Sequence, residues 1–109
     1  MAANPASPPP HEIGYDALLE AVENGSFAVV DVREPHEFAG GHIPGAVNLP
    51  LSGFTPDDLP TGKPLVLVCL AGGRSARALR EILAAGVEDA RHYPGGMNGW
   101  RALGGPVTL

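Results

Sequence analysis

Residues 65–75 read Leu-Val-Leu-Val-Cys-Leu-Ala-Gly-Gly-Arg-Ser, an apolar run that ends at a cysteine and passes into a glycine-containing loop. A continuous Leu/Val run is typical of a strand buried on both faces of a parallel sheet. A helical pattern begins at Ser75, so Cys69 lies between a buried strand and a helix N-terminus. Backbone N–H groups without helical partners collect at such a position, and the helix dipole favours negative charge there. We therefore expect the pKa of the Cys69 thiol to lie below about 8.5.

Strands and helices alternate on both sides of this stretch. Further strands are expected at residues 27–32, near 46–49 and near 90–93, and helices at residues 15–22, 75–85 and around 100–103. In the clearest helix Arg77 and Glu81 form an i,i+4 pair, and Gly86 provides the stop. The alternation predicts an α/β fold whose sheet is covered by helices on both faces. In such sheets ligands bind outside the carboxyl ends of the strands, which is where Cys69 lies.

Length and composition limit the organisation and the function classes. At 109 residues there is room for one core, so we expect a Pro/Ala-rich disordered leader at residues 1–10 and a single domain at residues 11–109. The net charge of -5 gives no electrostatic reason to expect nucleic acid or an anionic membrane as a partner. There is no apolar stretch of about 18 residues and no signal-peptide pattern, which predicts a cytoplasmic protein. A single cysteine excludes an internal disulfide and a CxxC site, and no metal or organic cofactor is indicated.

Two other loops that cradle anions share part of this pattern. A phosphate-binding Walker loop ends in Gly-Lys-Ser/Thr, which this sequence lacks. A cysteine phosphatase loop also places an arginine behind a thiolate, but that loop is longer than the four residues between Cys69 and Arg74. A smaller ring of amides suits a smaller group than phosphate.

Three motifs resemble those of the rhodanese-like sulfurtransferases. The loop motif of that family, Cys-x-x-Gly-x-Arg-Ser, is matched by Cys69, Gly72, Arg74 and Ser75. Residues 31–50 are similar to the family's Asp-x-Arg, Glu-x-x-x-Gly-His-Ile-x-Gly-Ala and Asn-x-Pro pattern. A third motif, Gly-Gly-x-x-x-Trp, matches residues 95–100.

The resemblance implies both a fold and a reaction. The fold is the single rhodanese domain, with a five-stranded, mostly parallel sheet and helices on both faces. In the reaction, Cys69 attacks the sulfane sulfur of a donor such as thiosulfate, and its persulfide then passes the sulfur to cyanide or a thiol. The expected cradle for the persulfide is formed by Leu70, Ala71, Gly72, Gly73, Arg74 and Ser75. Gly72 and Gly73 are expected to supply a tight, partly left-handed backbone path.

Several polar residues have a structural and a functional interpretation. Arg74 either steers an anionic donor or braces the loop by pairing with an acid such as Asp31, and the brace is favoured. Asp31 and Arg33 are both candidate supporting residues: Asp31 is interpreted as a structural partner, and substrate binding is the less favoured interpretation of Arg33. A preformed thiolate needs no base, so His42 is interpreted as a hydrogen-bonded structural residue. The remaining histidines, His11, His36 and His92, receive no role.

The sequence leaves more than one function open. A thiosulfate-type sulfurtransferase is favoured over a persulfide carrier acting on protein partners. A non-catalytic interaction domain and a phosphatase- or arsenate-reductase-like enzyme are the remaining alternatives. Members that use thiosulfate often carry basic side chains in the loop, whereas Leu70, Ala71 and Gly73 are neutral. A persulfide on a small thiol or on a protein therefore suits this loop at least as well as thiosulfate.

Overall fold

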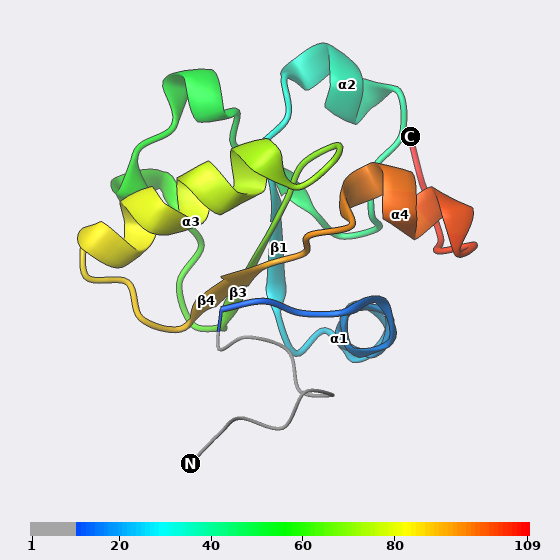
Figure 1. Ribbon diagram of the computed structural model, residues 1–109, viewed down its shortest axis with the longest axis horizontal. Helices are drawn as coiled ribbons and strands as arrows, with labels where there is room; N and C mark the ends of the chain where they lie inside the picture. The colour runs from blue at the N-terminus through cyan, green and yellow to red at the C-terminus, as the bar shows by residue number, and fades with distance from the viewer. Residues whose placement is uncertain (1–10) are drawn as a thin grey trace.

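The computed structural model describes residues 11–109, and the leader expected at residues 1–10 lies outside the described residues. Helices and strands alternate along the chain (Figure 1). In order they are α1 (Tyr15–Asn24), β1 (Ala28–Asp31), α2 (Pro35–Ala39), β2 (Val47–Asn48), the 3-10 turns η1 (Leu51–Gly53) and η2 (Pro56–Asp58), β3 (Leu65–Val68), α3 (Gly73–Ala84), β4 (Ala90–His92) and α4 (Gly96–Ala102). Every strand and helix expected from the sequence is therefore present; most ends shift by one or two residues, but α4 begins at Gly96, four residues before the helix expected there.

The strands form one parallel sheet in the order β2-β1-β3-β4. This confirms the α/β fold, but the sheet has four strands within residues 11–109 instead of the five that the family resemblance implied. Beside β4, the described residues form a parallel bridge between Glu12 and His92, in which the Ile13 N–H donates to the His92 carbonyl at 3.1 Å and the His92 N–H donates to the His11 carbonyl at 2.9 Å. On its C-terminal side this pairing ends where the chain enters α1 at Tyr15.

Helices cover both faces of the sheet, with α3 on one side and α1 and α4 on the other (Figure 1). The side chains of Leu65, Leu67 and Cys69 belong to the core that includes α3. Val66 and Val68 belong to the core that includes α1 and α4. Both faces of β3 are thus buried, which explains its continuous apolar run, and each buried Leu or Val stabilises the fold by roughly 1.5–3 kcal/mol. The alternation places Cys69 on the α3 side of the sheet.

Helix ends follow the glycines that the sequence offers. Gly25 ends α1 with a φ of 70°, and its N–H donates to the Ala21 carbonyl. The longest helix, α3, has 12 residues and carries the expected pair of Arg77 and Glu81, with 3.6 Å between Nε and Oε1. Within residues 11–109, no helix combines the length and the apolar character needed to cross a membrane.

Candidate active site

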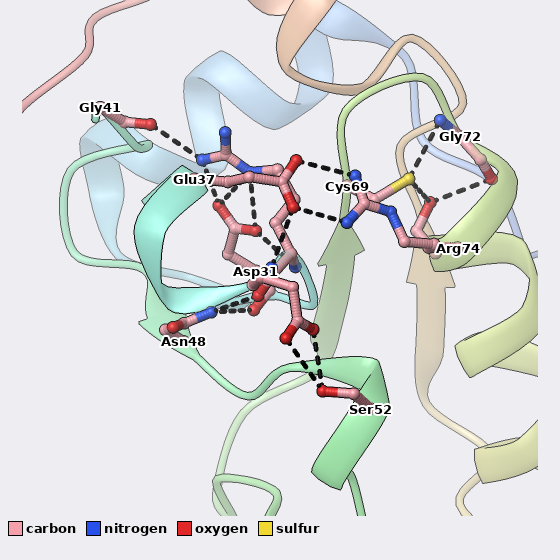
Figure 2. A network of polar contacts seen from close by, with 11 residues as sticks. Asp31, Glu37, Gly41, Asn48, Ser52, Cys69, Gly72 and Arg74 are labelled. Carbon is pink, nitrogen blue, oxygen red and sulfur yellow. Dashed lines mark hydrogen bonds and ion pairs between the residues drawn. The ribbon is translucent and has the colours of Figure 1, made fainter. Parts of the chain in front are cut away.

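Cys69 follows the last residue of β3 and lies at the carboxyl edge of the sheet, where the chain turns into α3 (Figure 2). The Gly72 N–H donates to Cys69 Sγ at 3.1 Å. The Ser75 Oγ lies 3.5 Å from the same sulfur. Cys69 is 1% exposed, so a reaction partner must present a terminal atom to the sulfur.

Opposing effects act on the pKa of Cys69. Burial is the largest single influence and raises the pKa. Hydrogen bonds of the sulfur with the Ser75 side chain and with the N–H groups of Ser75, Gly72 and Ala71 together outweigh burial, so the pKa of the thiol is lowered, as expected. The Gly72 N–H is the donor that contacts the sulfur directly, and the persulfide cradle expected at residues 70–75 stays a prediction.

The start of α4 holds the loop in this orientation. The Met97 N–H donates to the Cys69 carbonyl at 2.8 Å, and the Asn98 N–H donates to the Leu70 carbonyl at 3.0 Å. Because these carbonyls are bound on the α4 side, the N–H groups that follow can face the sulfur. Gly96 has a φ of 61°, and a Cβ there would collide with the Leu70 carbonyl. Gly96, the first residue of α4, is therefore part of the support of the Cys69 loop.

The two glycines of the loop differ in their conformation. Gly72 has a φ of 98°, and a Cβ there would collide with the Pro94 carbonyl. Gly73 was also expected on the left-handed path, but it is the first residue of α3, and a Cβ there would have no atom within 4 Å. The left-handed turn therefore depends on Gly72 alone.

Arg74 is paired with an acid, but the acid is Glu37 instead of Asp31 (Figure 2). Its two terminal nitrogens donate to the two carboxylate oxygens of Glu37 at 2.7 and 2.9 Å. Glu37 lies on α2 and also accepts the Glu34 N–H at 3.1 Å. A bidentate ion pair of this kind fixes the orientation of both side chains, so Arg74 connects the Cys69 loop to α2.

Asp31 and Arg33 form a separate buried pair. The Arg33 guanidinium donates to both carboxylate oxygens of Asp31 at 2.8 to 3.1 Å and to the Gly41 carbonyl at 2.8 Å. Arg33 is 2% exposed, so this structure does not bring it to the surface where a substrate would approach. The pair connects the end of β1 with the segment after α2 and so braces this part of the fold.

The Arg74–Glu37 pair predicts an acid-dependent stability. Arg74 lowers the pKa of Glu37 from 4.5 to about 2. A carboxylate with a depressed pKa stabilises the fold above its unfolded-state pKa, and this stabilisation is lost as the pH falls through the folded-state pKa. We therefore expect the free energy of unfolding to decline as the pH falls from 4.5 to about 2, and Glu37→Gln to remove part of that decline.

Urea unfolding at about pH 6 and about pH 3 measures this difference. Glu81→Gln is the matched control, because Glu81 also pairs with an arginine of α3 but at 3.6 Å and on the exposed surface. Exposed pairs contribute roughly 0–1 kcal/mol, so its acid dependence should stay close to that of the parent protein. An equal change in both variants would contradict the assignment to Glu37.

A groove of about 490 Å³ lies beside the loop. It is lined by Glu34, Leu51, Ser52, Arg74, Arg77 and Glu81. The two arginines in this lining are both paired, Arg74 with Glu37 and Arg77 with Glu81. The positive charge that an anionic donor would need is therefore largely compensated at the groove.

His92 is the residue near the sulfur that sequence reasoning missed. Its Nδ1 lies 3.0 Å from the Ser75 Oγ, and the ring is buried. In the structure β3 and β4 are parallel neighbours with Leu67 opposite His92, so both side chains and Cys69 share one face, and no local sequence pattern reveals this register. His42 agrees with its structural interpretation, because its Nδ1 lies 2.8 Å from the Phe38 carbonyl and its ring stacks on Phe38. Within residues 11–109, no three His, Cys, Asp or Glu side chains are grouped to hold a metal ion.

Comparisons with known proteins agree with this geometry. The family model of the rhodanese-like domain matches residues 15–103, which include β3, the Cys69 loop and α3. An uncharacterized protein of Synechocystis sp. is 48% identical over 98 residues; the match covers 88% of this chain but 55% of that protein, so the chain spans about half of its length. Thiosulfate sulfurtransferase GlpE of Shewanella oneidensis is 32% identical over 91 residues, and the match covers 81% of this chain and 89% of that protein. The crystal structure of a rhodanese-related protein from Thermoplasma volcanium superposes with a TM-score of 0.82 at 31% identity, over 91% of this chain and 98% of that one.

Proposed function

This chain belongs to the rhodanese-like domain family, and we propose that it transfers sulfane sulfur through a persulfide on Cys69. One observation carries the proposal. The Cys69 sulfur lies at the carboxyl end of the central strand, accepts the Gly72 N–H at 3.1 Å and has a lowered pKa. A thiolate stabilised in this way can act as a nucleophile without an adjacent base.

The proposed reaction has two displacement steps. In the first, Cys69 Sγ forms a bond to the outer sulfur of the donor, and the bond between that sulfur and the rest of the donor breaks. The leaving group takes the electron pair; with thiosulfate it is sulfite. In the second, an acceptor thiolate or cyanide attacks the outer sulfur of the persulfide, and Cys69 leaves as the thiolate. No net oxidant or reductant is consumed, and the enzyme returns to its starting state.

The hydrogen-bond donors around the sulfur suit the persulfide intermediate. After the first step the outer sulfur carries negative charge, and donors that are already oriented stabilise it without reorganisation. The Gly72 N–H donates to Cys69 Sγ at 3.1 Å and the Ala71 and Ser75 N–H groups help to lower the pKa of the same sulfur, which supports such a role beside the outer sulfur. The chain contains no second cysteine that would remove the outer sulfur by exchange.

The charge around the groove bears on the donor. Arg74 and Arg77 are both engaged by carboxylates, so a free dianion such as thiosulfate meets little uncompensated positive charge. This observation favours a second form of the proposal, in which the domain takes its sulfur from a thiol-borne persulfide on a small molecule or a protein. Thiosulfate then remains a usable but inefficient donor.

Intact-mass spectrometry after incubation with thiosulfate, or separately with glutathione persulfide, tests both forms. We expect a gain of one sulfur atom on Cys69 with either donor, its removal by cyanide as thiocyanate, and a higher kcat/KM for the persulfide donor. If neither donor adds sulfur, the sulfurtransferase proposal is wrong. If thiosulfate is the better donor, the inference from the paired arginines is wrong.

A further inference from the structure

A line of hydrogen-bonding groups runs from Cys69 through the buried interior to the edge of the sheet. The Ser75 Oγ lies 3.5 Å from Cys69 Sγ and 3.0 Å from His92 Nδ1. The other ring nitrogen of His92, Nε2, lies 3.6 Å from the Glu12 carboxylate. Ser75 is fully buried and His92 is 6% exposed, whereas the Glu12 side chain is 37% exposed. The thiol is thus connected to the surface through two buried polar side chains.

The Ser75 hydroxyl has one proton and three acceptors within reach. These are the Cys69 sulfur, His92 Nδ1 and the Gly72 carbonyl at 3.2 Å. A neutral imidazole has one N–H and one bare nitrogen, and a protonated imidazole has two N–H groups. The state of His92 therefore decides whether Nδ1 competes with the sulfur for the Ser75 proton.

The neighbours of His92 select its tautomer. Within the described chain, Glu12 is the one carboxylate within ion-pair distance of the ring, and it faces Nε2. A carboxylate there favours the proton on Nε2 and leaves Nδ1 as an acceptor. His11, on the same segment as Glu12, uses its own ring to contact the Ala90 carbonyl. On the α3 side the ring meets Ser75, and beyond Ser75 lies Cys69.

We propose that His92 is a positioning residue that controls, through Ser75, how readily Cys69 forms its thiolate. The neutral ring holds the Ser75 proton away from the sulfur, and the hydroxyl oxygen then accepts the proton of the neutral thiol. The protonated ring donates to the Ser75 oxygen and leaves the hydroxyl proton free for the thiolate. This role matters for catalysis only through the proposed function, on which the inference therefore rests. Its test measures thiolate formation and requires no sulfur transfer.

The direction of the pH effect follows from the burial of the ring. Burial lowers the pKa of His92, and the Glu12 carboxylate opposes that shift. At neutral pH the ring is therefore uncharged and Nδ1 competes for the Ser75 proton. Acidification that protonates His92 ends the competition and also places a positive charge near the sulfur.

The test is a thiolate titration followed by ultraviolet absorbance, with Cys69→Ser as the blank. It compares the parent protein with His92→Leu, Ser75→Ala and the double variant. In His92→Leu the competing acceptor is gone, so we expect the thiolate-to-thiol ratio at neutral pH to rise about tenfold, the size expected for a hydrogen bond to a charged group. In the Ser75→Ala background the same His92 substitution should leave the ratio unchanged.

Other outcomes overturn the proposal. A purely structural His92 would loosen the loop when replaced, and the ratio would fall. An effect of equal size with and without the Ser75 hydroxyl would show that His92 does not act through Ser75.

If His92→Leu does not fold, Glu12→Ala replaces it, because Glu12 is partly exposed and its bridge to β4 uses the backbone. Without the carboxylate the ring can carry its proton on Nδ1, so the thiolate ratio should rise, and this rise should again require Ser75. No rise would overturn the proposal. A protein that shows these shifts but gains no sulfur from any donor would disprove the proposed function and leave the role of His92 standing.

Discussion

Cys69→Ser is expected to abolish sulfur transfer and to leave the fold unchanged. A serine hydroxyl stays protonated at neutral pH, so the N–H groups around position 69 have no anion to stabilise and the donor meets no nucleophile. The side chains of serine and cysteine are close in size, and the serine oxygen can still accept the Gly72 N–H. We therefore expect a change in the free energy of unfolding of no more than about 1 kcal/mol.

Two measurements check this expectation on one preparation. Thiocyanate formation from thiosulfate and cyanide reports transfer, and thermal unfolding followed by circular dichroism reports the fold. Turnover by the folded variant above the uncatalysed rate would mean that Cys69 is not the sulfur carrier. An unfolded variant would mean that the Cys69 thiol contributes far more to the free energy of unfolding than the expected value of about 1 kcal/mol.

The sequence is most informative about this protein where the determinants are local. The strand of residues 65–68, the loop and α3 are contiguous, and their apolar run, glycines and helical spacing predict both the elements and the place of Cys69 between them. The strand count was less predictable, because the fifth position depends on how soon the chain after Glu12 turns into α1. No local pattern distinguishes a one-residue bridge from a short strand.

The supports of the site were harder to predict because they are distant in sequence. Glu37 lies 37 residues from Arg74, and several acids were equally plausible partners from the sequence alone. His92 lies 17 residues from Ser75 and approaches it only because β4 pairs with β3. Such contacts depend on strand order and register, which the sequence specifies only through the complete fold.

The same distant contacts explain how a short loop keeps its shape. Arg74 is held by α2, the carbonyls of Cys69 and Leu70 are held by α4, and Ser75 meets His92 of β4. These contacts involve different groups: the Arg74 side chain, two backbone carbonyls and the Ser75 side chain. The hydrogen-bond donors around the sulfur are thus fixed from three directions, and a backbone change at the tightest point of the loop should disturb all of them.

Gly72→Ala is expected to show this disturbance. A residue with a side chain is strained at a φ of 98°, and its Cβ would meet the Pro94 carbonyl, a backbone atom that cannot rotate away. We expect the free energy of unfolding to fall by roughly 1–3 kcal/mol. The loop must shift to relieve the collision, so the Gly72 N–H should no longer reach the sulfur. Losing a hydrogen bond to a thiolate corresponds to about a tenfold loss of thiolate, with at least as large a loss of transfer.

Gly73→Ala is the matched control, one residue further along the same loop. Its backbone is already helical and a Cβ there has no atom within 4 Å, so alanine should be tolerated and should raise stability by at most about 1 kcal/mol. Urea unfolding and thiocyanate formation, measured on both variants, separate the two positions. Equal losses in both variants would mean that the loop needs small residues in general. A large loss at Gly72 beside normal transfer at Gly73 would assign the shape of the sulfur site to the left-handed turn at Gly72.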